Sequence, residues 1–134
     1  MDKTIGKFAV NVAPLILVVD DDESMREALQ SLLRSVGYDT SLFASAEDFL
    51  TGDNRHSADC LILDVRMPEM NGLALQNRLI AEKSRLPIVF ISAHGEAGEK
   101  EQALAAGAID FLQKPFSESS LLDAVSMALK SKLD

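Results

Sequence analysis

The chain has 134 residues, of which 47% are hydrophobic and 25% are charged, a composition typical of a single soluble globular domain and not of a disordered chain. It carries 13 Lys and Arg residues against 21 Asp and Glu residues, a net charge of −8, and the scattered basic residues argue against nucleic-acid binding by this domain alone. The acidic balance favours cations such as Mg²⁺, and the longest apolar run, residues 8–19, is broken by Asn11 and Pro14 and is too short to span a membrane.

The first predicted element is a strand over residues 15–19, a fully apolar run that stops at three consecutive acids, Asp20 to Asp22. Residues 1–14 show no signal-peptide pattern and are interpreted as a flexible tail or a short extra strand. Ser24 and Glu27 have the spacing of a capping box, which predicts that a helix begins there.

The first helix continues to Gly37, which is expected to end it in a left-handed conformation. Its apolar face follows the i, i+3, i+4 spacing through Met25, Ala28, Leu29, Leu32, Leu33 and Val36. Residues 38–43 alternate loosely and predict a strand with one less buried face. A short helix capped by Ser45 and a polar loop over residues 52–57 follow.

Residues 58–64 are predicted to be a strand, and the apolar run directly before its last residue, Asp64, is expected of a strand buried on both faces. The only cysteine, Cys60, lies within it and is expected to be a buried small apolar residue; a catalytic thiol would need a nearby base. A single thiol gives no disulfide framework and fits a reducing cytoplasm. The helix predicted over residues 72–83 has no clean apolar stripe, so its buried face is uncertain.

The remaining elements continue the alternation, with a loop over residues 94–98. They are a strand over residues 86–92, a helix over residues 99–106, a strand over residues 108–113 and a last helix capped by Ser117. Five strands thus alternate with five helices. This order predicts an α/β, doubly wound parallel sheet with helices on both faces.

Polar side chains stand where four of the five strands end: Asp20 and Asp21, then Asp64, Ser92 and Lys114. Because the carboxyl ends of parallel strands share one edge of the sheet, where ligands bind, we expect these groups to converge. The alternative for Asp20 and Asp21 is that they are only acids at a helix start, favoured by the helix dipole. A surface lysine is the corresponding alternative for Lys114.

Three neighbouring carboxylates repel one another, and a divalent cation relieves that repulsion. Carboxylates and waters are the ligands of Mg²⁺, which also binds phosphate oxygens, and Lys114 would add one more positive charge. This is the recurring set of groups in phosphoryl transfer, and a carboxylate can itself be the nucleophile and form an aspartyl phosphate.

These residues resemble those of a response-regulator receiver domain of two-component signalling. The resemblance covers residues 15–131, leaving 1–14 as a tail and 132–134 as a C-terminal end. It is carried by four motifs in order: residues 18–21, residues 63–72, residues 91–93 and residues 114–116.

The resemblance implies a flavodoxin-like (βα)5 fold with strand order 2-1-3-4-5. It implies that Asp64 accepts a phosphoryl group from a sensor histidine kinase or a phosphotransfer protein. Asp21 and Asp64 would bind Mg²⁺ directly, Asp20 would help through water, and the main-chain carbonyl of Arg66 would complete the protein ligands.

Lys114 would contact the phosphoryl oxygens and Ser92 would hydrogen-bond to one of them, and the Lys114–Pro115 peptide bond is usually cis in this family. Ser92 and Phe111 would form the switch that changes the surface of the fourth helix, fifth strand and fifth helix. Two residues depart from the family pattern and bear on the strength of the switch, since threonine is commoner than serine at position 92 and tyrosine is frequent at position 111. Phe111 as ordinary core is the alternative.

The expected activity is limited to Mg²⁺-dependent self-phosphorylation and slow self-dephosphorylation, and a homodimer formed on phosphorylation is a further expectation. The chain would act alone or as the N-terminal part of a longer, transcriptional regulator, without a membrane partner. A Mg²⁺ phosphatase would need a second acid where Arg66 stands, and an unphosphorylated scaffold would not need the intact site. His94 is either an exposed loop residue or a modest influence on phosphoryl lifetime.

Overall fold

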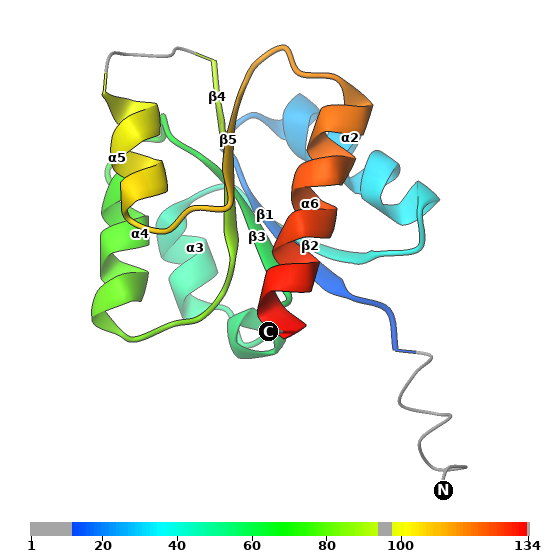
Figure 1. Ribbon diagram of the computed structural model, residues 1–134, viewed down its shortest axis with the longest axis horizontal. Coiled ribbons are helices and arrows are strands. Elements are labelled where there is room, and N and C mark those ends of the chain that lie inside the picture. The colour runs from blue at the N-terminus through cyan, green and yellow to red at the C-terminus, as the bar shows by residue number, and fades with distance from the viewer. Residues whose placement is uncertain (1–11, 94–97, 134) are drawn as a thin grey trace, which may run out of the picture.

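Five parallel strands form the central layer of the computed structural model, which describes residues 12–93 and 98–133 (Figure 1). Their order is β2-β1-β3-β4-β5, which confirms the predicted topology. The strands are β1 (Leu15–Val19), β2 (Asp39–Phe43), β3 (Cys60–Asp64), β4 (Ile88–Ser92) and β5 (Asp110–Gln113). The predicted tail over residues 1–11, together with His94, falls outside the described residues.

Four strands begin one or two residues later than predicted, while their carboxyl ends agree with the prediction. The residues just before them make backbone bonds, such as the Asp59 N–H to the Leu15 carbonyl at 2.8 Å and the Ile109 N–H to the Ile88 carbonyl at 2.8 Å. These bonds precede the regular ladder. The carboxyl ends, where the polar residues stand, are the better predicted ends.

Helices cover both faces of the sheet, as Figure 1 shows: α2 and α6 pack on one face, and α3, α4 and α5 on the other. They are α2 (Glu23–Ser35), α3 (Ala46–Thr51), α4 (Gly72–Ala81), α5 (Glu99–Ala105) and α6 (Glu118–Leu133), with a 3₁₀ turn, η1 (Arg55–Ser57). Among the described residues, no helix combines the length and apolar character needed to cross a membrane.

The alternation of side chains along β3 builds the core on both faces. Leu61 and Leu63 pack against the α3–α5 face, whereas Cys60 and Ile62 pack against the α2–α6 face, and all are fully buried. A strand in the centre of a doubly covered sheet therefore needs apolar residues at every position. Asp64 interrupts that rule where the strand ends.

The capping box predicted from Ser24 and Glu27 is wrong. The N-cap lies two residues earlier, because the helix begins at Glu23 and the Asp22 side chain accepts a 2.9 Å hydrogen bond from the Ser24 N–H. The predicted caps Ser45 and Ser117 are confirmed, each accepting a 3.0 Å bond from the N–H three residues on.

Helix α4 ends at Ala81, two residues before its predicted end, and its buried face explains why no clean apolar stripe was visible. Leu75 and Leu79 are buried together with a polar residue, Gln76, whose amide donates a 3.0 Å bond to the Ala103 carbonyl. A buried amide with a partner is tolerated in a core, but it hides the helical periodicity.

Candidate functional site

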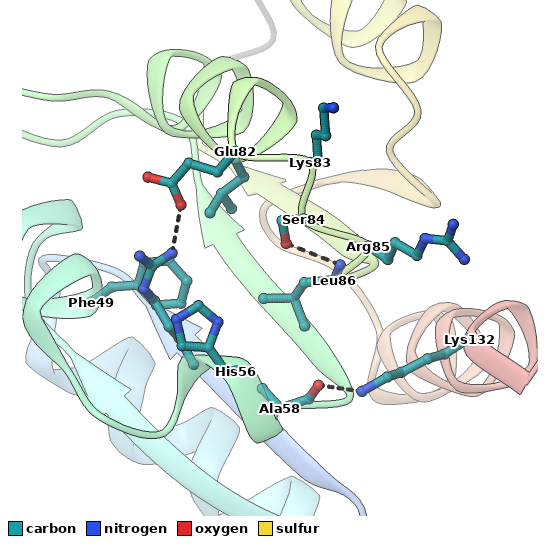
Figure 2. A pocket seen from close by; sticks show the side chains of 11 residues that line it. Phe49, His56, Ala58, Glu82, Lys83, Ser84, Arg85, Leu86 and Lys132 are labelled. Atoms are coloured by element: carbon teal, nitrogen blue, oxygen red, sulfur yellow. Dashed lines mark hydrogen bonds and ion pairs between the residues drawn. The ribbon is translucent and has the colours of Figure 1, made fainter.

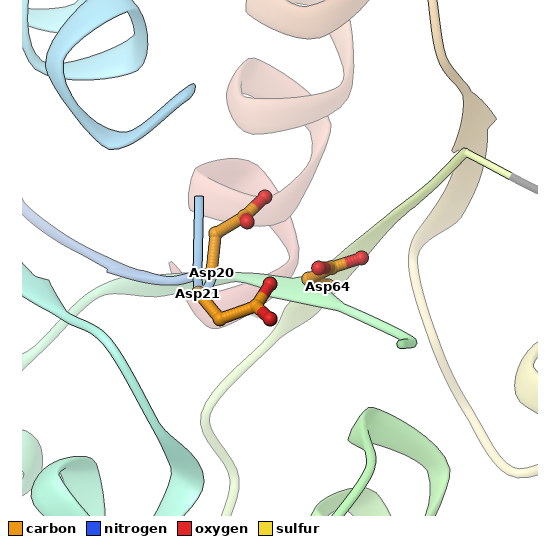
Figure 3. Close-up of side chains that lie close together, drawn as sticks. All are labelled: Asp20, Asp21 and Asp64. Carbon is orange, nitrogen blue, oxygen red and sulfur yellow. The ribbon is translucent and has the colours of Figure 1, made fainter. Parts of the chain in front are cut away.

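Three carboxylates meet at the carboxyl edge of the sheet, where β1 and β3 lie side by side (Figure 3). Asp20 and Asp21 follow β1 and Asp64 is the last residue of β3. Each offers an oxygen that lies within 4.8 Å of the others. Asp20 is 0% and Asp64 4% exposed, whereas Asp21 faces solvent, so two of the three acids are enclosed by protein.

The buried carboxylate of Asp20 is held by partners on both of its oxygens. The Asp22 N–H donates to Oδ1 at 2.8 Å, and the Lys114 ammonium lies 3.0 Å from Oδ2. The Arg26 guanidinium also donates to the Asp20 main-chain carbonyl at 2.7 Å. These bonds compensate the cost of burying a charge at a place where the chain must turn.

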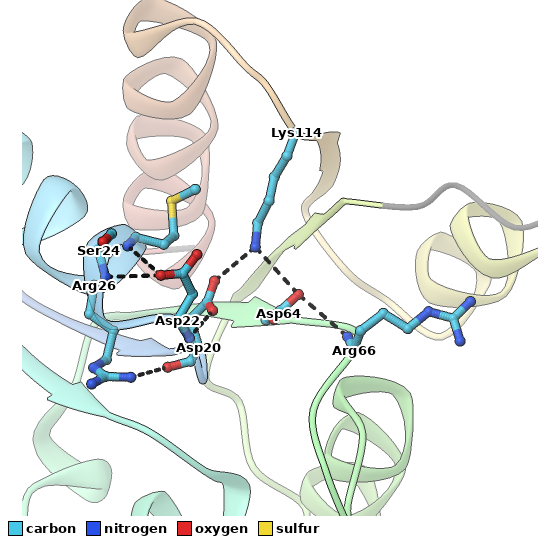
Figure 4. A network of polar contacts seen from close by, with 8 residues as sticks. Asp20, Asp22, Ser24, Arg26, Asp64, Arg66 and Lys114 are labelled. Carbon is cyan, nitrogen blue, oxygen red and sulfur yellow. Dashed lines mark hydrogen bonds and ion pairs between the residues drawn. The ribbon is translucent and has the colours of Figure 1, made fainter.

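Lys114 reaches the acids from the far side of the site, just after β5 (Figure 4). Its Nζ lies 3.7 Å from Asp64 Oδ1, farther than from Asp20. Its backbone N–H is fixed by a 2.7 Å bond to the Ser92 carbonyl, and the Lys114–Pro115 peptide bond is cis, as the resemblance implied. Residues 94 positions apart in sequence are thereby joined at one site.

The electrostatics of the site are incompletely balanced at Asp64. Burial, followed by the nearby charge of Asp20, raises the pKa of the Asp64 carboxyl from 3.8 to about 7, although Lys114 opposes the shift. Without a further cation, this carboxyl is therefore only partly ionised near neutral pH.

The donor set fits Mg²⁺, which prefers carboxylate oxygens and retains several waters. Asp20, Asp21 and Asp64 supply the carboxylates. The turn after β3 brings the backbone of Arg66 to the same place, since its N–H lies 3.4 Å from Asp64 Oδ1.

Gly72 has a packing role that the sequence did not assign to it. A Cβ at this position would lie 2.3 Å from the Asp64 carbonyl oxygen and 3.1 Å from the Phe90 ring. The Gly72 N–H also donates a 2.9 Å bond to the Val65 carbonyl. Helix α4 thus begins directly against the backbone at the end of β3, and the Asn-Gly pair at its start was the only signal available.

Ser92 and Phe111 lie on the same face of the sheet, because strand alternation puts Ser92 on the side of Phe90, whose ring packs with that of Phe111. Ser92 is fully buried. The Phe111 ring is only 6% exposed, and its centroid lies 5.9 Å from that of Phe90. Phe111 therefore belongs to the core in this structure.

The Arg66 side chain makes a contact that sequence reasoning missed. Its guanidinium turns away from Asp64 in Figure 4 and forms a 2.8 Å ion pair with Glu99 in the first turn of α5. No motif marks this pair, because its residues come from separate segments of the chain.

The chain matches the family model described as the response regulator receiver domain over residues 16–126. It is 49% identical to the response regulator protein TodT of Pseudomonas putida over 118 residues, which cover 88% of this chain and 52% of TodT. The transcriptional regulatory protein FixJ of Bradyrhizobium diazoefficiens is 38% identical, over 86% of this chain and 56% of FixJ. The chain spans about half the length of these curated relatives.

Solved structures with the same fold include that of the response regulator StyR. Its TM-score is 0.83 at 47% identity, over 90% of this chain and 61% of StyR. The structure of FixJ-N has a TM-score of 0.79 at 31% identity, over 89% of this chain and 95% of that chain.

Proposed function

The chain belongs to the response regulator receiver domain family, and on that premise we propose that Asp64 is its phosphoryl acceptor. The donor is a phosphohistidine on a sensor histidine kinase or a phosphotransfer protein. One observation carries the assignment: three carboxylates lie within 4.8 Å of one another, with the Lys114 ammonium 3.7 Å from Asp64. Groups of this kind neutralise charge in phosphoryl transfer.

The reaction is a displacement at phosphorus. An oxygen of the Asp64 carboxylate forms the new P–O bond while the P–N bond to the donor imidazole breaks, and the bonding pair leaves with the nitrogen. Asp64 is the only one of the three acids that is itself the last residue of a strand, and its side chain is 5% exposed.

Asp20, Asp21, Asp64 and the Arg66 carbonyl are the proposed ligands of Mg²⁺, which supplies positive charge to the phosphoryl oxygens when it is bound. Lys114 is the proposed second source of positive charge, because its Nζ already lies between Asp20 and Asp64. The buried Ser92 hydroxyl is the proposed donor to a third phosphoryl oxygen.

Ser92 and Phe111 are the proposed switch, acting on the surface formed by α5, β5 and α6. We further propose that phosphorylation favours a homodimer through this surface. Because the curated relatives are about twice as long, the receiver domain over residues 15–131 would control a further part of a longer cytoplasmic regulator.

The test is phosphorylation by acetyl phosphate with Mg²⁺, read as the mass increment of one phosphoryl group. Wild type should be labelled, EDTA should prevent labelling, and Asp64→Asn should abolish it because the amide is a poor nucleophile. Asp53→Asn, the same substitution in an exposed loop, is the matched control and should be labelled normally. Labelling that persists in Asp64→Asn would overturn the assignment.

A further inference from the structure

A second polar site lies at the opposite, amino end of the sheet (Figure 2). It is a cavity of about 250 Å³ lined by α3, the 3₁₀ turn η1 and Ala58 after it, the end of α4, the connection into β4 and the last turns of α6. Asp20, Asp64 and Lys114 are not among its lining residues, so it is separate from the phosphoryl site.

Positive charge is concentrated around this cavity. Four of the 13 Lys and Arg residues of a chain with net charge −8 line it: Arg55, Lys83, Arg85 and Lys132. Glu82 is the only acid among the described lining residues, and its two oxygens already bind Arg55 at 3.0 Å and Arg78 at 3.2 Å. Lys132 is likewise paired, with Asp59 at 3.1 Å, so the excess positive charge at the cavity comes from Lys83 and Arg85.

The interior of the cavity is apolar. Leu86 is half-buried at its wall, whereas Phe49, Ala58 and Leu79 behind it are at most 3% exposed. The Arg55 guanidinium lies 6.0 Å from the centroid of the Phe49 ring. In Figure 2 the Lys132 ammonium reaches Ala58, whose carbonyl accepts a 2.5 Å bond from it. A ligand here would meet apolar surface within and charge around the edge, which is how small-molecule sites are commonly built.

The backbone of Lys83 distinguishes it from an ordinary surface lysine. Helices α2 and α5 end in left-handed residues that are glycines, Gly37 at φ +92° and Gly107 at φ +105°. Helix α4 ends the same way, but the residue is Lys83 at φ +62°. Its N–H bonds to the Ile80 carbonyl at 2.9 Å, as the N–H of Gly107 bonds to the Leu104 carbonyl at 3.0 Å.

A glycine at this position would avoid the steric cost that a Cβ meets in the left-handed region. Lys83 keeps a side chain at this position and is among the residues that line the cavity. Its flexible stem allows the ammonium to close over a bound anion.

We propose that this cavity binds a compact organic anion, with a carboxylate or phosphate at the edge that carries Lys83 and Arg85 and an apolar body against Leu86. The site goes beyond phosphoryl acceptance and is independent of it. Because the cavity is smaller than a typical drug-sized site, the expected Kd is on the order of millimolar.

The test is a titration of the full chain in EDTA, followed by amide NMR shifts and calorimetry. Phenyl phosphate and benzoate distinguish a phosphate from a carboxylate, inorganic phosphate lacks the apolar body, and phenol lacks the charge. We expect at least one of the two organic anions to give saturable shifts around Arg55, Lys83 and Leu86, with weaker binding of phosphate and phenol. The proposal would be overturned if inorganic phosphate or phenol bound as tightly as phenyl phosphate and benzoate. It would also be overturned if no ligand gave a saturable shift around Arg55, Lys83 and Leu86.

Lys83→Gly separates binding from folding. Glycine should raise the urea midpoint, because it adopts the left-handed conformation without steric strain. It should lower the affinity for the anion by about two- to fivefold, as expected for the loss of one exposed ionic contact. Lys100→Ala removes an exposed lysine on α5 as a control and should leave the affinity unchanged. Unchanged affinity in Lys83→Gly would show that this lysine is not a ligand and would overturn its assignment.

Discussion

The two ends of β3 carry ionisable groups that respond differently to the same environment. Cys60 begins the strand and Asp64 ends it, and both are buried. Burial is the largest cause of a raised pKa in each, to about 12 for the Cys60 thiol and about 7 for the Asp64 carboxyl. The thiol stays neutral at physiological pH, whereas the carboxyl is held near its titration point.

The charged groups around the two ends of β3 also differ in how exposed they are. At the amino end, charges lie near the surface over an apolar cavity, and the pairs that form there, such as Arg55 with Glu82, are partly exposed. At the carboxyl end, Asp20 and Asp64 are enclosed and share one lysine. An exposed charge lowers the stability of the folded protein little, whereas a buried charge lowers it strongly. The buried acids at the carboxyl end are therefore expected to destabilise the fold more than the charges at the amino end.

Gly72→Ala should give the largest effect, because it disturbs the backbone of the carboxyl end directly. A Cβ placed 2.3 Å from the Asp64 carbonyl oxygen forces α4 and β3 apart, which should cost about 3 kcal/mol of unfolding free energy. Urea unfolding measures it. Gly37→Ala, at a glycine with no atom within 4 Å of an added Cβ, is the control for backbone strain alone and should cost less.

Ionisation of Asp64 should make the metal-free protein less stable as pH rises from about 4 to about 7. The unfolded chain releases this proton near 3.8, whereas the folded chain retains it until about 7, so stability present below the lower value is lost across this window. Above it, Asp64→Asn should be more stable than wild type in EDTA by about 2 kcal/mol, because the amide removes a buried charge.

Urea unfolding of wild type and Asp64→Asn as a function of pH isolates the carboxyl from other acids. Mg²⁺ should shrink or reverse the difference between the two proteins. A difference that stays constant between pH 4 and 7 would contradict the electrostatic account. Cys60 provides the contrast, since its raised pKa should reduce stability only as pH rises above about 9.

Asp22→Ala should have the smallest effect of the three, about 1 kcal/mol, because it removes the side chain that caps α2. Asp22→Asn keeps an acceptor oxygen and should cost little, and Ser24→Ala should also be close to neutral. Thermal unfolding measures all three. A larger loss of thermal stability in Ser24→Ala than in Asp22→Ala would support the predicted Ser24 cap over the Asp22 cap.

The sequence was sufficient where one local pattern decides the structure. The apolar runs before Asp20, Asp64 and Ser92 defined the sheet and the edge at which its polar residues meet. The correct strand order came from the resemblance, since periodicity alone leaves several orders open. The cap of α2 was misassigned because Asp22 and Ser24 are both good caps, and only the first helical residue decides between them.

Contacts between distant segments were beyond local reasoning. The Arg66–Glu99 pair and the amino-end cavity are each assembled from segments that carry no shared motif. Gln76 shows the converse, because a buried polar residue with a distant partner made a real helix face look irregular. Tertiary packing supplies these partners, and a pattern along the chain does not record them.

The position of Lys114 has a consequence for reactivity. Its ammonium is anchored 3.0 Å from the fully enclosed Asp20 and lies 3.7 Å from Asp64. A short charge-assisted bond would have occupied a lone pair on Asp64 and made that oxygen a weaker nucleophile. With Asp20 as its anchor, the lysine places its positive charge beside Asp64 Oδ1 without a short bond to it, so the 3.4 Å contact from the Arg66 N–H is the nearer one to that oxygen.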